Sequence, residues 1–258
     1  MNKLSVVILT KNGMPTISKT LKSVSWADEI LVVDSGSADK TIFECKKYKN
    51  CRVIETHWRG FSKQHYFGVV NAKYDWILNI DQDEIVSNEL SIRIQSLLSQ
   101  KRLKGAFRIK RYTFYVLKLI KHSWSHDYPV RFFNKSFDNF KDESIPHEYV
   151  VGKSIRIKIQ EPIIHYCYNS FTEHIDKISF YAKDGALYRF KKGKTSSLSK
   201  SILRGLFMFF KMYFLRRGFL DGKTGLALAV NSGFYSYLKY LNLWELNKKG
   251  RDGTFHKT

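Results

Sequence analysis

At the point that decides its fold, the chain reads Trp76-Ile77-Leu78-Asn79-Ile80-Asp81-Gln82-Asp83-Glu84. The largely apolar run that opens this stretch predicts a buried strand, so three carboxylates stand where the strand ends. Asp81 and Asp83 are two residues apart, so on extended backbone they point the same way and can share one divalent cation and the phosphates that it carries. Because Asp-x-Asp also occurs in turns and helix caps, the stretch alone leaves both interpretations open.

Short apolar runs alternate with helix-length segments from residue 4 to about residue 90. Strands are predicted at 4–10, 29–34, 52–55 and 76–81, with helices between them at about 14–25, 38–48 and 61–73. This alternation is typical of βαβ units, which build a parallel sheet covered by helices. The strands of such a sheet are buried on both faces, so continuous apolar runs are expected.

The pattern changes after residue 105. Short β-rich pieces follow at 106–109, 130–133, 155–159 and 163–166, broken by Pro129, Pro146 and Pro162. They predict a mixed extension of the same sheet. Beyond Phe171 the sequence is typical of helices, near 171–192, 198–217 and 224–246. We therefore predict one α/β domain over residues 1–170 and a basic helical region over 171–258.

The charge of the chain predicts an anionic partner. Among 258 residues, 44 Lys and Arg stand against 23 Asp and Glu, a formal net charge of +21. The charge is concentrated, with eight basic residues and no acid between Lys101 and Lys121, and ten basic residues against Asp184 alone between Lys183 and Arg217. Nucleic acid, anionic lipid and phosphorylated sugars all qualify as partners.

The chain has three cysteines, Cys45, Cys51 and Cys167. An odd number without CxxC spacing argues against a disulfide framework and a zinc ribbon, and it favours a reducing compartment. The first residues run directly into the strand at 4–10, and Lys11 interrupts the apolar run too early for a signal peptide. We therefore expect a cytoplasmic protein.

The C-terminal segments mix large apolar residues with cations. Residues 202–217 combine Phe, Leu and Met with Lys and Arg, and 225–238 is uncharged. Neither segment reaches the eighteen or so apolar residues that a membrane span requires. Two interpretations stay open: a helix lying in the membrane interface, or a core helix with its charges in solvent.

Four segments, taken in order, carry a family resemblance: SVVILTKN (5–12), WADEILVVDSGSADKT (26–41), HWRGF (57–61) and DWILNIDQDE (75–84). Together they resemble glycosyltransferase family 2, and within it the lipopolysaccharide-core branch of the β-1,4-glucosyltransferase type. The resemblance covers nearly the whole chain. It includes the later motifs DYPVRFF (127–133), PHE (146–148), IHY (164–166) and RGFLDG (217–222).

The resemblance implies a GT-A fold, which is a Rossmann-like and mostly parallel sheet with flanking helices. It places donor binding in residues 1–100 and the acceptor side in 101–170, and it implies a UDP-sugar donor and Mg²⁺ or Mn²⁺. Thr10 and Asp34 end the first two strands, where ligands of open α/β sheets bind, so Asp34 can accept the imide N–H of the base. By the family pattern, Asp81 approaches the ribose or the metal, and Asp83 ligates the ion that bridges the diphosphate.

An inverting transferase needs a base that deprotonates the acceptor hydroxyl. Glu148 matches a His-Glu pair of the family pattern, and Asp127 matches an acid four residues before an arginine. We favour Glu148 as the base. The alternatives are that Asp127 only pairs with Arg131 and that Glu148 only orients His147. Arg131 has two possible roles, a contact to the diphosphate or structural pairing.

The resemblance implies an anionic acceptor, a lipid-linked, phosphorylated core oligosaccharide at the inner face of the cytoplasmic membrane. Such an acceptor and the anionic leaflet would both explain the basic surface. A capsule unit, a lipid carrier or a protein are alternative acceptors for the same fold. A nucleic-acid-binding module would explain the charge but not the carboxylates, so we expect no nucleic-acid partner.

The chain departs from the family pattern at three places. Gly13 stands where the family usually has Glu, and Gln82 stands where it usually has Ala. His65 and Tyr66 follow Gln64 where the family has a basic residue and Asn. None of these departures removes a predicted metal ligand, so we expect an active enzyme.

Overall fold

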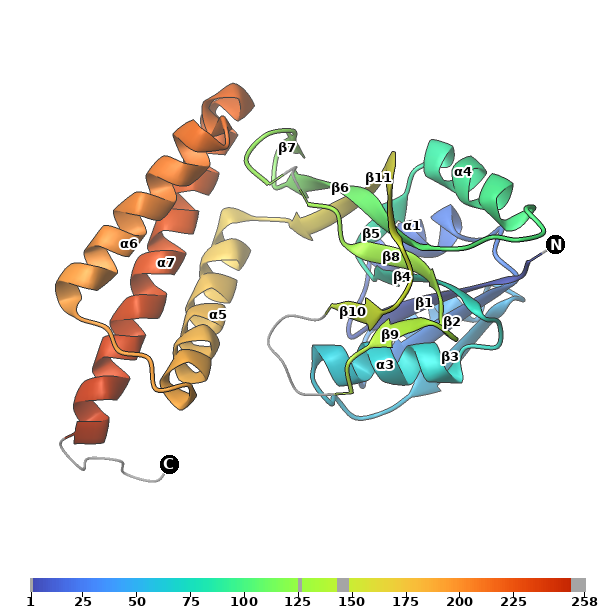
Figure 1. Cartoon of the computed structure of the whole chain (residues 1–258), viewed down its shortest axis with the longest axis horizontal. Coiled ribbons are helices and arrows are strands. Elements are labelled where there is room, and N and C mark those ends of the chain that lie inside the picture. The colour runs from blue at the N-terminus through green and yellow to red at the C-terminus, as the bar shows by residue number, and fades with distance from the viewer. Residues whose placement is uncertain (1, 125–126, 143–148, 252–258) are drawn as a thin grey trace. The chain divides into compact units, whose positions relative to one another are not determined.

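The computed structural model describes residues 2–124, 127–142 and 149–251 (Figure 1). Glu148, the favoured base, lies outside the described residues. The chain divides into two compact units. The first comprises Met1–Tyr112 and His126–Tyr166, and the second comprises Thr113–Ser125 and Cys167–Thr258. The functional division at residue 170 stays a prediction.

Four parallel strands form one half of the main sheet. In sheet order they are β3 (Cys51–Glu55), β2 (Glu29–Asp34), β1 (Leu4–Thr10) and β4 (Trp76–Asp81). All four were predicted from the sequence, with β3 beginning one residue earlier than expected. Thr10 pairs in register with Asp34, and Leu9 pairs with Asp81, so the carboxyl ends of β1, β2 and β4 meet at one edge.

The sheet extends beyond β4 through strands that include antiparallel pairs, which agrees with the predicted mixed extension. The order continues through β8 (Val130–Asn134), β6 (Ala106–Tyr115), β11 (Arg156–Tyr168) and β5 (Glu84–Val86). Off this path, β7 (Lys118–Ile120) pairs with β6, while β9 (Asp138–Phe140) and β10 (Val150–Gly152) form a separate two-stranded sheet. Because β4 ends at Asp81 and β5 begins at Glu84, the acidic stretch is a tight turn held at both ends by the same sheet.

Helices cover both faces of the sheet (Figure 1). They are α1 (Thr16–Ser23), α2 (Thr41–Cys45), α3 (Phe61–Asn71) and α4 (Asn88–Leu98). Three are shorter than predicted, and α2 begins late because the carboxylate of Asp39 accepts hydrogen bonds from both N–H and Oγ1 of Thr41. The fourth, α4, was not predicted from the sequence, although Ser87 caps it by accepting from the N–H of Leu90.

The side chains of β1 point alternately into two hydrophobic clusters, one on each face of the sheet. Val6 and Ile8 face a cluster that includes α1 and α4, whereas Val7 and Leu9 face a cluster that includes Val69 of α3. All four β1 side chains are buried. A strand buried on both faces has no polar face, which is why the sequence shows a continuous apolar run there.

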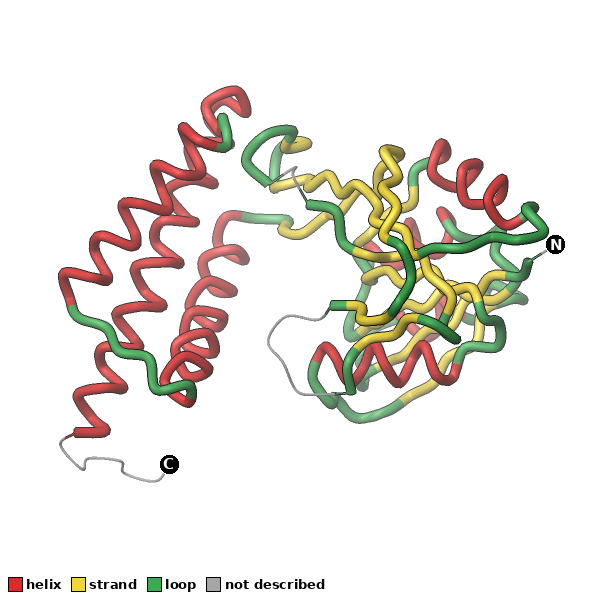
Figure 2. Tube along the Cα trace, in the orientation of Figure 1, coloured by secondary structure: helices red, strands yellow, loops and turns green. Residues whose placement is uncertain are grey.

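The second unit is built on three long helices (Figure 2). α7 (Gly222–Arg251) packs against both α5 (Phe171–Lys191) and α6 (Leu198–Phe210). Beyond α6 the chain continues as a π-helical turn, Lys211–Leu215, and a 3-10 turn, Gly218–Asp221. α6 and α7 approach closely at Gly205, where an added Cβ would lie 2.9 Å from Cβ of Tyr237 and 3.2 Å from the carbonyl oxygen of Gly233.

The motif RGFLDG (217–222) has a structural role in the second unit. The buried carboxylate of Asp221 accepts hydrogen bonds from the backbone N–H groups of Lys121, His122 and Ser123, at 2.9 to 3.3 Å, and from Oγ of Ser123 at 2.8 Å. Gly218 allows a close approach, since a Cβ there would lie 2.6 Å from the carbonyl oxygen of Met212. The motif thus anchors segment 121–123 to the start of α7.

A buried histidine sits among aromatic rings in this unit. His174 of α5 is 3% exposed and contacts the rings of Tyr115, Trp124 and Tyr168. The hydroxyl of Tyr115 lies 2.6 Å from His174 Nδ1, and Nδ2 of Asn231 lies 3.2 Å from the same atom. The amide nitrogen of Asn231 can only donate, so this arrangement requires an unprotonated Nδ1 and a neutral ring. Burial, and to a lesser extent Lys177, lower the pKa of His174 to about 4.

We expect His174 to make the stability of the protein fall in mild acid. The unfolded pKa is 6.5 and the folded value is about 4, so the unfolded chain binds more protons between these values. The contribution is complete above pH 6.5 and is lost as the pH falls toward 4, by roughly 3 kcal/mol at 1.36 kcal/mol per pKa unit. Urea denaturation at pH 7.5 and pH 5 should show a smaller pH dependence in His174→Gln than in the wild type. The same pH dependence in both proteins would refute this account.

Candidate active site

The carboxyl edge of the parallel strands gathers three of the predicted donor-site residues, Thr10, Asp34 and Asp81. Thr10 of β1 is 4% exposed, and Asp34 of β2 is fully buried. The Asp34 carboxylate accepts hydrogen bonds from the N–H groups of Gly36 and Ser37, at 2.9 and 2.8 Å, and from Oγ of Ser37 at 2.5 Å. Asp34 therefore shapes the loop after β2, and its contact to a nucleotide base stays a prediction.

The loops after β1 and β2 are locked together. Oγ of Ser37 accepts from the N–H of Asn12, and Oδ1 of Asn12 accepts from the N–H of Ala38, both at 2.8 Å. Asn12 adopts a left-handed backbone with φ of 51°, a conformation that Asn tolerates better than most residues. These reciprocal bonds hold the edge of the sheet in one shape before any ligand binds.

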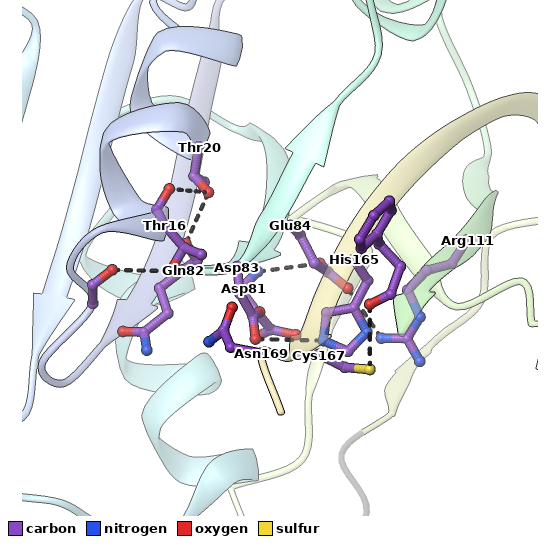
Figure 3. Close-up of polar contacts among 12 residues, drawn as sticks. Thr16, Thr20, Asp81, Gln82, Asp83, Glu84, Arg111, His165, Cys167 and Asn169 are labelled. Atoms are coloured by element: carbon purple, nitrogen blue, oxygen red, sulfur yellow. Dashed lines mark hydrogen bonds and ion pairs between the residues drawn. The ribbon is translucent and has the colours of Figure 1, made fainter. Parts of the chain in front are cut away.

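The turn Gln82-Asp83 is tied to the same edge. Oε1 of Gln82 accepts from Oγ1 of Thr10 at 2.6 Å and from the N–H of Lys11 at 3.0 Å. The carbonyl oxygen of Gln82 accepts from Oγ1 of Thr20 at 2.8 Å (Figure 3). Gly13 lies beside this contact, because an added Cβ would stand 2.8 Å from Thr10 Oγ1 and 3.0 Å from Gln82 Oε1. Two departures from the family pattern thus lie together, and the amide of Gln82 uses space that the missing side chain of Gly13 leaves.

Asp81 is held as a carboxylate. Its Oδ2 accepts from Arg131 at 2.7 Å, and its Oδ1 lies 3.8 Å from Nε2 of His65. Burial raises the pKa of Asp81, but Arg131 and His65 outweigh burial and hold that pKa well below its usual range. The side chain is 30% exposed, so one side remains open to a ligand.

Glu84 is the buried centre of the ion-pair cluster. Its side chain is fully buried, and Oε1 accepts from Arg111 at 3.0 Å and from Arg131 at 2.8 Å. Its other oxygen accepts from the N–H of Asp81 at 3.1 Å. Arg111 and Arg131 belong to β6 and β8, so this one carboxylate ties the acidic turn to two antiparallel strands.

We expect Glu84→Gln to destabilise the protein by about 3–5 kcal/mol, because it leaves the buried guanidinium of Arg131 and its neighbour Arg111 without their shared counter-charge. Urea denaturation would measure the loss. Glu89→Gln, which removes an exposed carboxylate from the first turn of α4, should leave the stability nearly unchanged. Equal stability of both variants would show that Glu84 does not hold the cluster together.

Asp83 lies in the turn itself and is 26% exposed. Its Oδ2 is 3.5 Å from Nε2 of His165 on β11, and its carbonyl oxygen accepts from the N–H of Tyr166 at 2.9 Å. Burial lowers the pKa of His165, but the hydrogen bond and charge of Asp83 outweigh it and raise that pKa. The contact of His165 with Asp83 was not predicted, because a histidine in an apolar strand is more typical of the core.

The acidic turn fits a metal that is shared with a ligand, not one that the protein cages alone. In the described segments, no group of three His, Cys, Asp or Glu side chains is arranged to hold a metal ion. Asp83 nevertheless offers a partly exposed carboxylate that pairs with no arginine in the described chain. Mg²⁺ is typically held by one or two carboxylates together with substrate phosphates, so Asp83, with Asp81 beside it, matches that donor set.

Asp127 pairs with a different arginine from Arg131, which its position in the sequence had suggested. Its carboxylate pairs with the guanidinium of Arg111, and Asp127 and Arg111 also form a β-bridge through their backbones. Arg131, by contrast, pairs with Asp81 and Glu84 and is 3% exposed. The side chain of Asp127 remains 46% exposed. The structure thus brings Thr10, Asp81, Asp83 and Arg131 to one region of the first unit, with Asp127 linked through Arg111.

A separate cavity of about 530 Å³ lies beside α3. Trp58, Arg59, Lys63 and Tyr66 are among its lining residues, and the acidic turn is not. The guanidinium of Arg59 stacks on the ring of Phe67 at 4.4 Å. His57, Trp58 and Arg59 of the motif HWRGF line this cavity, whereas Asp81 and Asp83 do not.

Known proteins resemble this chain over most of its length. The family model described as Glycosyl transferase family 2 matches residues 5–163. An uncharacterized glycosyltransferase of Rickettsia bellii is 31% identical over 263 residues, covering 95% of this chain and 87% of the relative. The lipopolysaccharide core biosynthesis glycosyltransferase LpsC of Rhizobium meliloti is 23% identical over 252 residues, covering 94% and 92%. A solved structure of Staphylococcus aureus TarS 1–349 in complex with UDP-GlcNAc has a TM-score of 0.49 and 15% identity, covering 99% of this chain and 93% of that one.

The class of protein follows from the sheet, its covering helices and the acidic turn at its carboxyl edge, which together define an α/β protein of the GT-A type. The chain belongs to glycosyl transferase family 2 and is a glycosyltransferase.

Proposed function

We propose that the protein is an inverting, metal-dependent hexosyltransferase that moves glucose from a UDP-sugar to a lipopolysaccharide or lipooligosaccharide core acceptor. The observation that carries this proposal is the turn after β4, where Asp83 is partly exposed while Asp81 and Glu84 are fixed by Arg131. The name of the relative LpsC supports a core acceptor.

In this proposal the donor lies across the carboxyl edge of the parallel strands, where open α/β sheets bind ligands. Thr10 and Asp34 hold the nucleoside end, and Asp81 approaches the ribose or the metal. Asp83 ligates Mg²⁺ or Mn²⁺, and this ion, when bound, neutralises the charge that develops on the leaving diphosphate. Arg131 positions Asp81 and adds positive charge close to the phosphates.

The base in this proposal is Glu148. It takes the proton of the acceptor hydroxyl as that oxygen attacks the sugar from the face opposite the leaving diphosphate. Asp127 is the second candidate. Its carboxylate is engaged with Arg111, and this pairing favours a positioning role for Asp127 over direct proton transfer.

The proposed acceptor is membrane-bound, and an exposed surface of the second unit suits that location. No helix in the described part of the chain is both long and apolar enough to span a bilayer. One face of α6 and the following π-helical turn carries an apolar stripe, in which every side chain is more than half exposed: Leu203, Leu206, Phe207, Phe210 and Phe214. The opposite face packs on α7 through Gly205.

A helix packed on its own protein normally turns a polar face to solvent, so an outward apolar stripe calls for another apolar phase. The chain has no acidic residue from 185 to 220, and Lys200, Arg204 and Lys211 lie along this helix. Cations beside an apolar stripe are the pattern of a helix that lies in an anionic membrane interface. We therefore propose that the enzyme acts as a peripheral protein on the inner face of the cytoplasmic membrane.

We expect Phe207→Ser/Phe210→Ser to weaken binding to vesicles containing phosphatidylglycerol by on the order of tenfold or more, because each phenyl group loses its transfer free energy. Vesicle co-sedimentation would measure this. Phe43→Ser/Phe137→Ser removes two phenyl groups of similar exposure from the first unit and should bind like the wild type. If both double variants bind equally well, the apolar stripe is not the membrane-binding surface.

The acceptor assignment is tested by transfer itself. Purified enzyme with UDP-glucose and Mn²⁺ should glucosylate a truncated core oligosaccharide, and mass spectrometry would record the addition of one hexose. Capsule units, lipid-carrier intermediates and unfolded protein serve as competing acceptors in parallel reactions. Transfer to one of these, with none to the core, would replace the proposed acceptor while leaving the donor site intact.

A further inference from the structure

A small cavity in the second unit gathers four cations. It has a volume of about 230 Å³ and lies between the end of α5, the first turns of α6 and the middle of α7. Its lining includes Arg189, Lys194, Thr195, Lys200, Arg204 and Tyr240. At about 30 Å³ for each water of the liquid, this space holds several waters or one phosphate group.

The two arginines are positioned by one aromatic ring. The guanidinium of Arg189 lies 5.1 Å from the ring centroid of Tyr240, and that of Arg204 lies 5.4 Å from the same centroid. Tyr240 is 7% exposed, so it is a fixed support. Stacking on a ring orders a guanidinium but leaves its N–H groups free to fork onto an oxyanion.

In the described part of the chain, carboxylates do not balance these charges. Other lysines of the same helices have acidic partners, since Lys177 pairs with Glu173 and Lys249 with Glu245. Within the described segments, no ion pair joins Arg189, Lys194, Lys200 or Arg204 to a carboxylate. Lys200 instead donates to the carbonyl oxygen of Thr195 at 3.0 Å.

We propose that this cavity binds a phosphate group of a phosphorylated ligand. Four like charges that line one small space repel each other, and an anion with several oxygens removes that repulsion. Two guanidiniums held on one ring can each make a two-pronged contact to the oxygens of one phosphate group. A carboxylate has only two oxygens, so it can satisfy only part of these contacts. The lining residues of this cavity all belong to the second unit, whereas the residues of the proposed donor site belong to the first.

A phospholipid headgroup is one source of that phosphate, and a soluble phosphorylated molecule is the other. Lys200 and Arg204 share α6 with the exposed Leu203 and Phe207. A phospholipid could therefore place its phosphate in the cavity and its acyl chains against the apolar stripe of the same helix. Binding of a phosphate group in this cavity does not depend on glycosyl transfer. It can therefore be tested in the full-length protein whether or not the proposed activity is found.

The test compares two double variants of the full chain that lose the same charge. Arg189→Gln/Arg204→Gln removes the stacked arginines. Lys183→Gln/Lys192→Gln removes two exposed lysines of the same unit that do not line the cavity. One arm measures co-sedimentation with vesicles of phosphatidylglycerol in phosphatidylcholine at fixed ionic strength. The other arm measures calorimetric binding of glycerol 3-phosphate and inorganic phosphate.

The arginine variant should bind at least about tenfold more weakly than the lysine variant in one of the two arms. A selective loss on vesicles assigns the phosphate to a phospholipid, and a selective loss with glycerol 3-phosphate assigns it to a soluble ligand. Equal binding of the two variants in both arms would overturn the proposal. If Arg189→Gln/Arg204→Gln fails to fold, as judged by near-ultraviolet circular dichroism, Arg189→Lys/Arg204→Lys takes its place, because it keeps the charge but loses the guanidinium groups. Wild-type binding by Arg189→Lys/Arg204→Lys would also overturn the assignment.

Discussion

Asp83→Ala is expected to lower transfer on the order of a thousandfold or more and to remove metal-dependent binding of UDP, while the protein stays folded. The side chain lies in the turn after β4, is partly exposed, and contacts His165. Its loss removes the proposed metal ligand and with it several kcal/mol of charge stabilisation at the leaving diphosphate. Initial rates with UDP-glucose and Mn²⁺, together with calorimetric UDP titration, would measure both effects.

Asp75→Ala is the matched control. Asp75 is exposed and directly precedes β4, so its substitution removes the same charge from the opposite end of the same strand. We expect this variant to keep its activity and its UDP affinity. Wild-type turnover by Asp83→Ala, or an equal loss in both variants, would contradict the assignment of Asp83 as a metal ligand.

Glu148→Gln is expected to lower turnover by about 10²–10⁴-fold with little change in donor affinity. A general base contributes factors of this size, and glutamine keeps the shape of the side chain without its ability to take a proton. The effect should fall on the chemical step, so the rate constant at saturating donor should fall while UDP affinity stays constant. Steady-state kinetics and UDP titration separate the two quantities.

Asp127→Asn decides between the two candidate bases. Because Asp127 is paired with Arg111, we expect its substitution to disturb the ion-pair cluster and to lower turnover less than Glu148→Gln does. Normal turnover in Glu148→Gln combined with an inactive Asp127→Asn would transfer the role of base to Asp127.

The parallel half of the sheet was predictable because burial on both faces leaves a clear mark on the sequence. All seven residues of β1 are buried, and its continuous apolar run at 6–9 marks the strand in the sequence. The carboxyl ends of neighbouring parallel strands necessarily meet at one edge. The proximity of Thr10, Asp34 and Asp81 therefore follows from their positions at the ends of three such strands.

The ion-pair cluster was not predictable in the same way, because it depends on the register of antiparallel strands. Arg111 and Arg131 come from β6 and β8, and His165 comes from β11, all far from the acidic turn in sequence. No local pattern states which residue of a strand will face Glu84. The pairing of Asp127 with Arg111 in place of Arg131 is a consequence of that register.

The role of Gln82 was missed for a related reason. The sequence shows it only as a departure from the family pattern, whereas the structure shows its amide bridging to Thr10 and Lys11. The contact becomes intelligible once Gly13 is seen beside it. In the second unit, helices were visible from composition, but which face of α6 packs on α7 required the close approach at Gly205.

The most direct test of a GT-A donor site is calorimetric titration of the full-length protein with UDP, with and without Mn²⁺, beside ADP and GDP. The proposed function predicts binding that requires the metal and that favours uridine over adenine and guanine. Absence of binding to any of the three nucleotides, in protein shown to be folded, would contradict it. The fold would then be shared with the family without its donor site, and the basic cavity of the second unit would become the leading guide to function.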